Sequence, residues 1–229
     1  MKILLLVDIQ NDFCPGGALA VPQGDKIVPV VNRLMASGEY DLIVASQDWH
    51  PVNHSTFITQ HPGKAVFDQI DLKGHTETLW PEHCVANTPG AEFHPDLRVD
   101  LIDHVVKKGT KVELDSHSAF IENDQVTSTG MHEYITKIAN QRGIDPCEIE
   151  LTVAGLAFDI CVAYTIRDAK RLGYHQVIPL DARRLLSPEG EAAFLAELDR
   201  MEIEVTTAEK LIPSERERGP AIEINQQRA

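Results

Sequence analysis

Short apolar runs alternate with amphipathic stretches along most of the chain. Runs rich in branched apolar residues predict β-strands near residues 2–7, 41–46, 103–106, 150–154, 176–180 and 202–205. Apolar residues at helical spacing predict helices near residues 25–37, 128–142, 160–172 and 188–200. The last helix has an N-terminal signal, with Ser187 as its cap and Pro188 at its first position. Strands that alternate with helices indicate an α/β fold, a doubly wound parallel sheet with helices on both faces.

Four chemically reactive residues lie at or just after the ends of predicted strands: Asp8, Asp48, Lys108 and Cys161. Ligands of doubly wound sheets bind beyond the carboxyl ends of the strands. We therefore expect these four side chains to gather at one edge of the sheet.

Cys161 lies where an apolar segment ending at Gly155 gives way to a helical pattern that stops at Gly173. A thiol in the first turn of a helix is close to the positive end of the helix dipole and to unpaired N–H groups, which favour the thiolate. The alternative is an inert core cysteine, which is the usual state of a lone cysteine. The rest of the chain has to decide between the two.

Asp8 and Lys108 would give such a cysteine its catalytic partners. An aspartate can accept the thiol proton and deliver it to a leaving amine, and a lysine can stabilise the resulting anions. Successive strand residues face opposite sides, so only one of Lys107 and Lys108 should point into the site. A cysteine–histidine pair stays open as well, because the chain has ten histidines.

The segment 47–102 does not follow the strand–helix alternation. It holds five of the 13 prolines and six of the ten histidines. A loop of this length in a compact domain is usually functional or disordered, and its aromatic residues argue against disorder. Its candidate ligands for a divalent ion such as Zn²⁺, Fe²⁺ or Mn²⁺ are Asp48, His50, His54 and His83. Cys84 is a further candidate ligand. The alternative to a metal site is that these histidines lie on a solvated loop and bind no ion.

Composition narrows the classes of function. The formal net charge of −14 argues against a nucleic-acid or anionic-membrane surface. No apolar run has transmembrane length, and the apolar start lacks a cleavage site. The four irregularly spaced cysteines favour a reducing cytoplasm over a disulfide framework. No glycine-rich phosphate loop is present.

From the 229 residues we expect a single domain over 1–212, with a long metal-site loop at 47–102 and a C-terminal tail at 213–229. The expected partner is a small-molecule substrate. The sequence leaves open whether the protein is a monomer or a homo-oligomer.

Six motifs occur in order over residues 1–185. They are VDIQNDF at 7–13, SQDWHPVNHSTF at 46–57, LWPEHCVANTPGAEFHPDL at 79–97, KKGT at 107–110, DSHSAF at 115–120 and GLAFDICVAYTIRDA at 155–169. Together they resemble the nicotinamidase (pyrazinamidase) branch of the isochorismatase-like cysteine hydrolases. The resemblance implies a six-stranded parallel sheet of Rossmann-like topology.

The resemblance also implies roles for individual residues. It assigns the catalytic triad to Asp8, Lys108 and Cys161, and the oxyanion hole to the backbone N–H groups of Ala157 and Cys161. It implies a cis peptide between Leu156 and Ala157. Phe13 and Trp80 match the aromatic walls around the pyridine ring. The implied metal ligands are Asp48, His50 and His83, with His54 as a further direct or water-bridged ligand, and Zn²⁺ is the preferred ion.

The implied reaction is hydrolysis of nicotinamide to nicotinate and ammonia through a cysteine thioester, with pyrazinamide as a second substrate. The metal would hold the ring nitrogen and so orient the amide. The alternatives are another amidase or vinyl-ether hydrolase of the same superfamily, and a non-catalytic metal-binding or thiol-redox protein. The chain departs from many members at Phe158, at Ile160 and in a longer stretch at 58–78.

Overall fold

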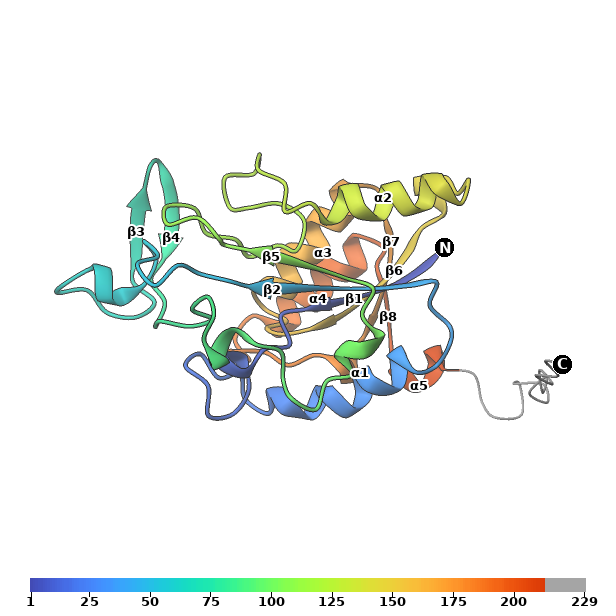
Figure 1. The fold of residues 1–229 in the computed structure, drawn as a ribbon, viewed down its shortest axis with the longest axis horizontal. Helices are drawn as coiled ribbons and strands as arrows, with labels where there is room; N and C mark the ends of the chain where they lie inside the picture. Colours follow the sequence, from blue (N-terminus) through green and yellow to red (C-terminus); the bar gives the residue numbers. More distant parts are fainter. Residues whose placement is uncertain (213–229) are drawn as a thin grey trace, which may run out of the picture.

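A six-stranded parallel sheet forms the centre of the computed structural model, which describes residues 1–212 (Figure 1). Its strands lie in the order β5–β2–β1–β6–β7–β8. They are β1 (Lys2–Val7), β2 (Leu42–Asp48), β5 (His104–Lys108), β6 (Glu150–Gly155), β7 (His175–Pro179) and β8 (Glu204–Thr206). All six predicted strands are confirmed. The predicted tail at 213–229 lies outside the described residues.

The central strand β1 shows why a continuous apolar run suits this position. Its residues from Ile3 to Val7 are fully buried. Ile3, Leu5 and Val7 pack into the core on one face of the sheet, and Leu4 and Leu6 pack into the core on the other. A strand covered on both faces has no solvent side, so the sequence shows no polar alternation.

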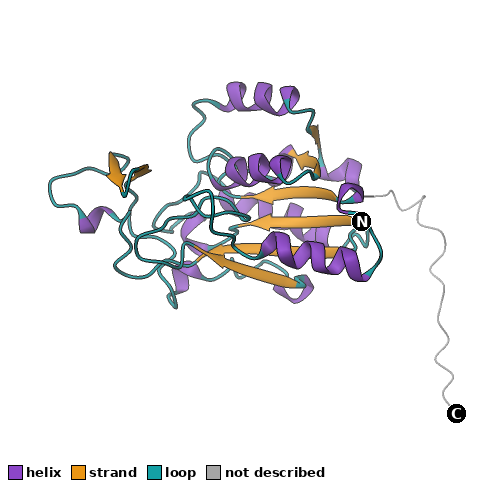
Figure 2. Ribbon diagram, turned by 90° about the horizontal axis from the view of Figure 1, so that it is seen from above, coloured by secondary structure: helices purple, strands orange, loops and turns teal. Residues whose placement is uncertain are grey.

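Within residues 1–212, five α-helices cover the two faces of the sheet (Figure 2). They are α1 (Val28–Met35), α2 (Met131–Gln141), α3 (Cys161–Arg171), α4 (Glu191–Arg200) and α5 (Ala208–Leu211). Buried residues of α2, α3 and α4 belong to one core, and those of α1 and α5 to the other. The predicted doubly wound α/β fold is confirmed. No helix among residues 1–212 is both long and apolar enough to cross a membrane.

Short 3₁₀ turns connect several of these elements. They are Asn11–Phe13, Gly24–Ile27, Ile58–Gln60, Pro89–Ala91, Val99–Leu101, Pro146–Glu148 and Leu180–Ala182. The helix predicted over 25–37 is therefore a 3₁₀ turn followed by α1.

The predicted start of the last helix at Pro188 is wrong. Gly190 has a φ of 87°, in the left-handed region, and α4 begins after it at Glu191. The Ser187 hydroxyl instead accepts a hydrogen bond from the Glu189 N–H. Because a left-handed residue interrupts the helical path, residues 187–190 form a turn that precedes the helix.

The long segment 47–102 contains an antiparallel hairpin that the sequence pattern did not predict. Its strands are β3 (Gln69–Leu72) and β4 (His75–Thr78), joined by a turn with positive φ at Lys73 and Gly74. The hairpin stands apart from the main sheet, beyond the ends of β2 and β5 (Figures 1 and 2). It leads directly into Leu79 and Trp80, which are buried.

Candidate active site

The carboxyl edge of the sheet brings three predicted catalytic residues together. Asp8 follows β1, Lys108 ends β5, and Cys161 begins α3. Lys108 Nζ lies 3.0 Å from Asp8 Oδ2 and 3.8 Å from Cys161 Sγ. Asp8 and Lys108 are fully buried, and Cys161 is 5% exposed. The structure therefore places a carboxylate, an ammonium group and a thiol in one contact group.

The two oxygens of the Asp8 carboxylate have different partners. Its Oδ1 accepts a hydrogen bond of 2.7 Å from the Ser46 hydroxyl. Its Oδ2 is buried and has the Lys108 ammonium as an ion-pair partner, but no well-directed hydrogen bond reaches it. A carboxylate oxygen of Asp8 also lies within 4.8 Å of Cys161 Sγ. This oxygen is placed to accept a proton from the thiol.

The charges of this group are strongly perturbed. Burial raises the pKa of Asp8 to about 6, although Lys108 opposes the increase. Burial disfavours the charge of Lys108, but Asp48 and Asp8 outweigh it and raise the pKa of the ammonium. Lys108 also forms an ion pair with Asp48 and donates a hydrogen bond of 2.8 Å to the Ser116 carbonyl. Lys108 therefore stays charged although it is fully buried.

At Cys161 the helix N-terminus and the surrounding buried residues act on the thiol in opposite directions. Burial raises the pKa of the thiol, and the carboxylates of Asp8 and Asp48 raise it further, although Lys108 opposes them. Burial and the two carboxylates therefore work against the thiolate that the helix N-terminus favours, and a nearby base would help to remove the thiol proton.

The two neighbouring lysines of β5 face opposite ways. The side chain of Lys108 is buried in the site. The ammonium of Lys107 lies 3.2 Å from the ring centre of Trp49 instead. The alternation of side chains along a strand accounts for this difference, as the sequence predicted.

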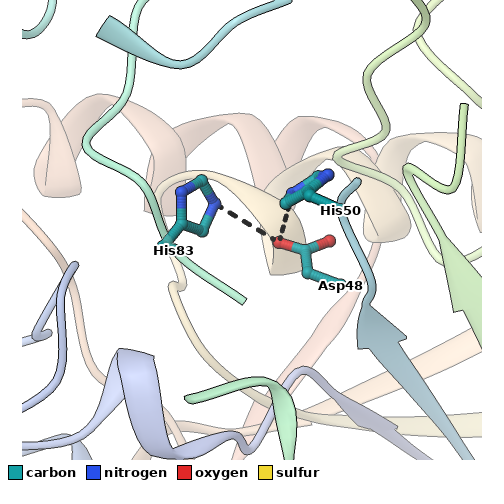
Figure 3. Close-up of side chains that lie close together, drawn as sticks. All are labelled: Asp48, His50 and His83. Atoms are coloured by element: carbon teal, nitrogen blue, oxygen red, sulfur yellow. Dashed lines mark ion pairs between the residues drawn. The ribbon is translucent and has the colours of Figure 1, made fainter. Parts of the chain in front are cut away.

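Asp48, His50 and His83 form a second group beside the first (Figure 3). The Nε2 atoms of His50 and His83 lie 3.7 Å and 3.8 Å from Asp48 Oδ2. Nδ1 of His50 lies 3.0 Å from the Gly109 carbonyl, and Nδ1 of His83 lies 2.8 Å from the Pro81 carbonyl. Because a carbonyl only accepts, each Nδ1 carries the proton of that hydrogen bond. Both Nε2 atoms are thus turned toward the carboxylate.

Gln10 fixes the backbone of Asp48, and Gly109 lies directly against the His50 ring. The Gln10 side chain donates to the Asp48 carbonyl and accepts from the Asp48 N–H, each at 2.8 Å. Gly109 has a φ of 61°, and a Cβ atom there would lie 2.4 Å from His50 Cε1. Only a glycine lets the backbone come this close to the ring.

The donor set of this group fits a divalent ion. One carboxylate and two imidazoles suit Zn²⁺ or a related ion, and hydrogen bonds from the far nitrogen of each ring are typical of metal-bound histidines. Burial and the charge of His50 lower the pKa of His83 to about 4, which keeps the ring neutral, the form in which an imidazole can coordinate a metal. Burial opposes the charge of His50, but Asp48 outweighs it and raises the pKa of His50.

The other two candidate ligands lie outside this group. Nδ1 of His54 is 2.8 Å from the Thr56 hydroxyl, and the ring lies against His50 with 4.5 Å between ring centres. His54 shares a separate group with His50 and Asp115. The Cys84 sulfur lies 4.0 Å from the Gly90 carbonyl, and no group within the described residues joins it to Asp48.

A cavity opens beside the two groups. It is lined by Asp48, His83 and Cys161, by the aromatic side chains Phe13 and Trp80, and by Leu19, Val21, Asp115, His117, Ala157, Ile160 and Leu186. Phe13 and Trp80 both lie near the His83 ring, with ring centres 5.6 Å and 6.3 Å from it. Aromatic side chains therefore form part of the cavity wall beside the histidine.

The turn between β6 and α3 offers free hydrogen-bond donors to this cavity. No acceptor among the described residues takes a hydrogen bond from the backbone N–H of Ala157 or of Cys161. The peptide between Leu156 and Ala157 is cis, as the resemblance implied. Two unpaired N–H groups beside a thiol are the usual parts of an oxyanion hole.

Three residues of the DSHSAF motif belong to the site, although the sequence alone gave them no role. The Asp115 carboxylate accepts hydrogen bonds from the Thr56 hydroxyl and the Ser116 N–H. The Ser116 carbonyl accepts from Lys108, and His117 lines the cavity. The available signal was the motif itself, which is one of the six that carry the resemblance.

Two of the three departures from the family pattern, Phe158 and Ile160, are single residues that lie in different positions. Phe158 is fully buried and packs against Phe194 and the guanidinium of Arg183, outside the cavity wall. Ile160 lines the cavity. Of these two residues, Ile160 is therefore the one placed to influence which ring fits.

Comparisons with known proteins agree with this geometry. A family model described as the isochorismatase domain matches residues 2–210. The chain belongs to the isochorismatase family. Within the family it is similar to the nicotinamidase of Escherichia coli strain K12, with 44% identity over 80% of this chain and 83% of the relative.

Solved structures of the family extend the comparison. The nicotinamidase pyrazinamidase of Acinetobacter baumanii has 37% identity and a TM-score of 0.82, covering 92% of this chain and 97% of that one. The pyrazinamidase of Pyrococcus horikoshii in complex with zinc has 34% identity and a TM-score of 0.68, covering 90% of this chain and 98% of that one. The fold of the chain is thus that of family members that hydrolyse amides.

Proposed function

We propose that this protein is a nicotinamidase that hydrolyses nicotinamide to nicotinate and ammonia and also accepts pyrazinamide. The observation that carries the proposal is the contact group of Asp8, Lys108 and Cys161 at the base of an aromatic cavity. Relatives with 37–44% identity carry the same activity in their names. The described domain, residues 1–212, would act as one hydrolase unit.

The cavity walls would bind and orient the substrate ring. Phe13 and Trp80 would stack on its two sides and exclude water, which stabilises the complex mainly through burial of apolar surface. With the ring fixed between them, the carboxamide carbon would face the Cys161 sulfur. Orientation of this kind can lower a barrier by about 7 kcal/mol or more.

Asp8 would act first as a base. It would take the proton of the Cys161 thiol as the sulfur forms a bond to the carboxamide carbon. A pKa of about 6 suits a base that works near neutral pH. The Lys108 ammonium, 3.8 Å from the sulfur, would stabilise the developing thiolate.

The backbone would stabilise the tetrahedral intermediate. The N–H groups of Ala157 and Cys161 would donate to the oxygen that becomes negative, and one such donor is typically worth about 3 kcal/mol. The carbon–nitrogen bond then breaks, and Asp8 returns the proton to the leaving nitrogen, which departs as ammonia. A water molecule attacks the resulting thioester while Asp8 takes its proton. The carbon–sulfur bond breaks, the proton on Asp8 returns to the sulfur, and the product leaves as nicotinic acid, which passes its remaining proton to ammonia in solution to give nicotinate and ammonium.

Asp48, His50 and His83 would hold one divalent ion per chain, with Zn²⁺ as the preferred candidate and His54 as a nearby further or water-bridged ligand. When bound, the ion would supply a Lewis acid for the pyridine nitrogen. Asp48 also forms an ion pair with Lys108. This ion pair links the candidate metal ligands to the catalytic group. The four cysteines are free thiols, which fits action in a reducing cytoplasm.

The deciding experiment is ammonia release from nicotinamide and from pyrazinamide by the purified protein, with Cys161→Ala as the control. We expect release by the wild type and none above background by the variant. Release from neither amide would refute the proposal and favour another hydrolase of the family. Turnover that survives Cys161→Ala would refute the thioester route.

A further inference from the structure

A buried carboxylate joins the β3–β4 hairpin to the wall of the substrate cavity. Glu77 of β4 is only 6% exposed, although the hairpin stands apart from the sheet. Its Oε2 accepts a hydrogen bond of 2.9 Å from Asn123 Nδ2. Burying a carboxylate is costly unless its position serves a contact, so this pair needs an explanation.

Asn123 connects Glu77 to residues 115–117, in the segment that follows Lys108. Its Oδ1 accepts a hydrogen bond of 3.0 Å from the His117 N–H, and its own N–H donates 2.8 Å to the Asp115 carbonyl. One carboxylate oxygen of Glu77, one of Asp115 and a ring nitrogen of His117 lie within 4.8 Å of one another. The hairpin is therefore tied to residues 115–117 through a single buried acid.

His117 is a partition between two cavities. Its ring lies between Trp80 and Tyr164, with ring centres 5.9 Å and 5.0 Å away. On one side it lines the substrate cavity. On the other side it lines a polar cavity whose wall includes Glu77 and Asn123. A shift of this ring would widen the first cavity at the expense of the second.

We propose that Glu77 is a positioning residue that acts through Asn123 and His117 to fix the width of the substrate cavity. The inference rests on the proposed function for the identity of the substrate, but not for the position of the ring. Without the carboxylate, the Asn123 amide loses its acceptor and the His117 backbone loses its fixed partner. The ring would then sample positions in which the substrate is held less tightly.

Steady-state kinetics on Glu77→Ala would test the role. We expect KM for nicotinamide to rise about tenfold while kcat stays within about twofold, because binding is lost and the reacting groups are untouched. Glu77→Gln keeps an oxygen that can accept from Asn123, so it should restore KM. Asn123→Ala breaks the same link from the other side and should reproduce the rise if Glu77→Ala does not fold.

A double-mutant cycle would show whether Glu77 acts through His117. His117→Ala alone should raise KM, and Glu77→Ala in that background should add no further rise. Additive effects would overturn the proposal, and so would an unchanged KM in Glu77→Ala.

Glu113→Gln is the matched control. Glu113 forms an exposed ion pair with Lys73 at the tip of the same hairpin, so the variant also removes an acid that links hairpin and loop. Exposed pairs contribute little, and KM should not change.

Imidazole NMR signals give a readout that needs no substrate. The His117 signal should shift in Glu77→Ala and stay in place in Glu113→Gln. If the wild type releases no ammonia while this shift occurs, the proposed function fails and the positioning role stands. If ammonia is released but neither KM nor the signal changes, the positioning role fails and the function stands.

Discussion

The ammonium of Lys108 lies 3.8 Å from the sulfur of Cys161, across 53 residues of chain. It also forms ion pairs with the buried carboxylates of Asp8 and Asp48. One cation thus balances two acids and faces the thiol. Its loss should affect stability and activity together.

Lys108→Met should lower kcat/KM by about 10³-fold or more, because the thiolate loses its counterion. It should also destabilise the fold by about 3–5 kcal/mol, since two buried carboxylates remain without a cation. Kinetics and denaturant unfolding measure the two effects. Lys107→Met serves as the control, and it should change kcat/KM by less than about twofold, because Lys107 lies on Trp49. Equal losses in the two variants would contradict the assignment.

Cys161→Ala should abolish turnover and leave substrate binding intact, because the aromatic walls and the ligand group do not depend on the sulfur. Calorimetry with nicotinamide and ammonia release with the same sample separate the two. Asp8→Asn should behave in the same way, since the amide cannot take the thiol proton. Residual turnover in Cys161→Ala close to that of the wild type would exclude covalent catalysis.

Gly109→Ala should weaken metal binding by about 10- to 100-fold, as expected for a change behind a ligand. The added methyl group would press on the His50 ring, and the backbone there has a positive φ. Equilibrium dialysis against Zn²⁺ measures the affinity. Gly143→Ala is a suitable control, because Gly143 also has a positive φ but nothing lies within 4 Å of its added Cβ. Similar affinities for the two variants would show that His50 is not a ligand.

Removal of the metal by a chelator should reduce nicotinamide binding and turnover together. The proposed ion orients the ring through its nitrogen and leaves bond making to Cys161 and Asp8. Calorimetry on the chelated protein, followed by readdition of Zn²⁺, provides the comparison. Full affinity in the metal-free protein would disprove an orienting role.

Glu77 should make the stability of the fold fall as pH rises. Burial, helped by repulsion from Asp115, raises the pKa of Glu77 from 4.5 to about 7 against the opposing hydrogen bond from Asn123. The folded state therefore holds this proton more tightly than the unfolded state. Its stabilising contribution is complete below pH 4.5 and is lost as pH rises through about 7. Thermal unfolding between about pH 5 and pH 8 should show a smaller decline of Tm in Glu77→Gln than in the wild type. Parallel curves would mean that Glu77 titrates normally.

The sequence by itself determined the sheet and the edge at which chemistry occurs. Continuous apolar runs such as Ile3–Val7 define buried parallel strands, because local pattern and burial agree along their whole length. Asp8, Asp48 and Lys108 could be placed at one edge because each occupies a strand end. The strand alternation also separated Lys108 from Lys107.

The tertiary structure decided what depends on contacts between distant segments. Burial and two carboxylates raise the pKa of Cys161, and the local helix signal contains neither influence. Glu77 acquires its partners only when the hairpin meets Asn123, 46 residues away. A pattern of period two or 3.6 records which face of an element is apolar. Such a pattern does not record which polar atoms of two distant loops form hydrogen bonds with each other. Contacts of that kind shape the cavity.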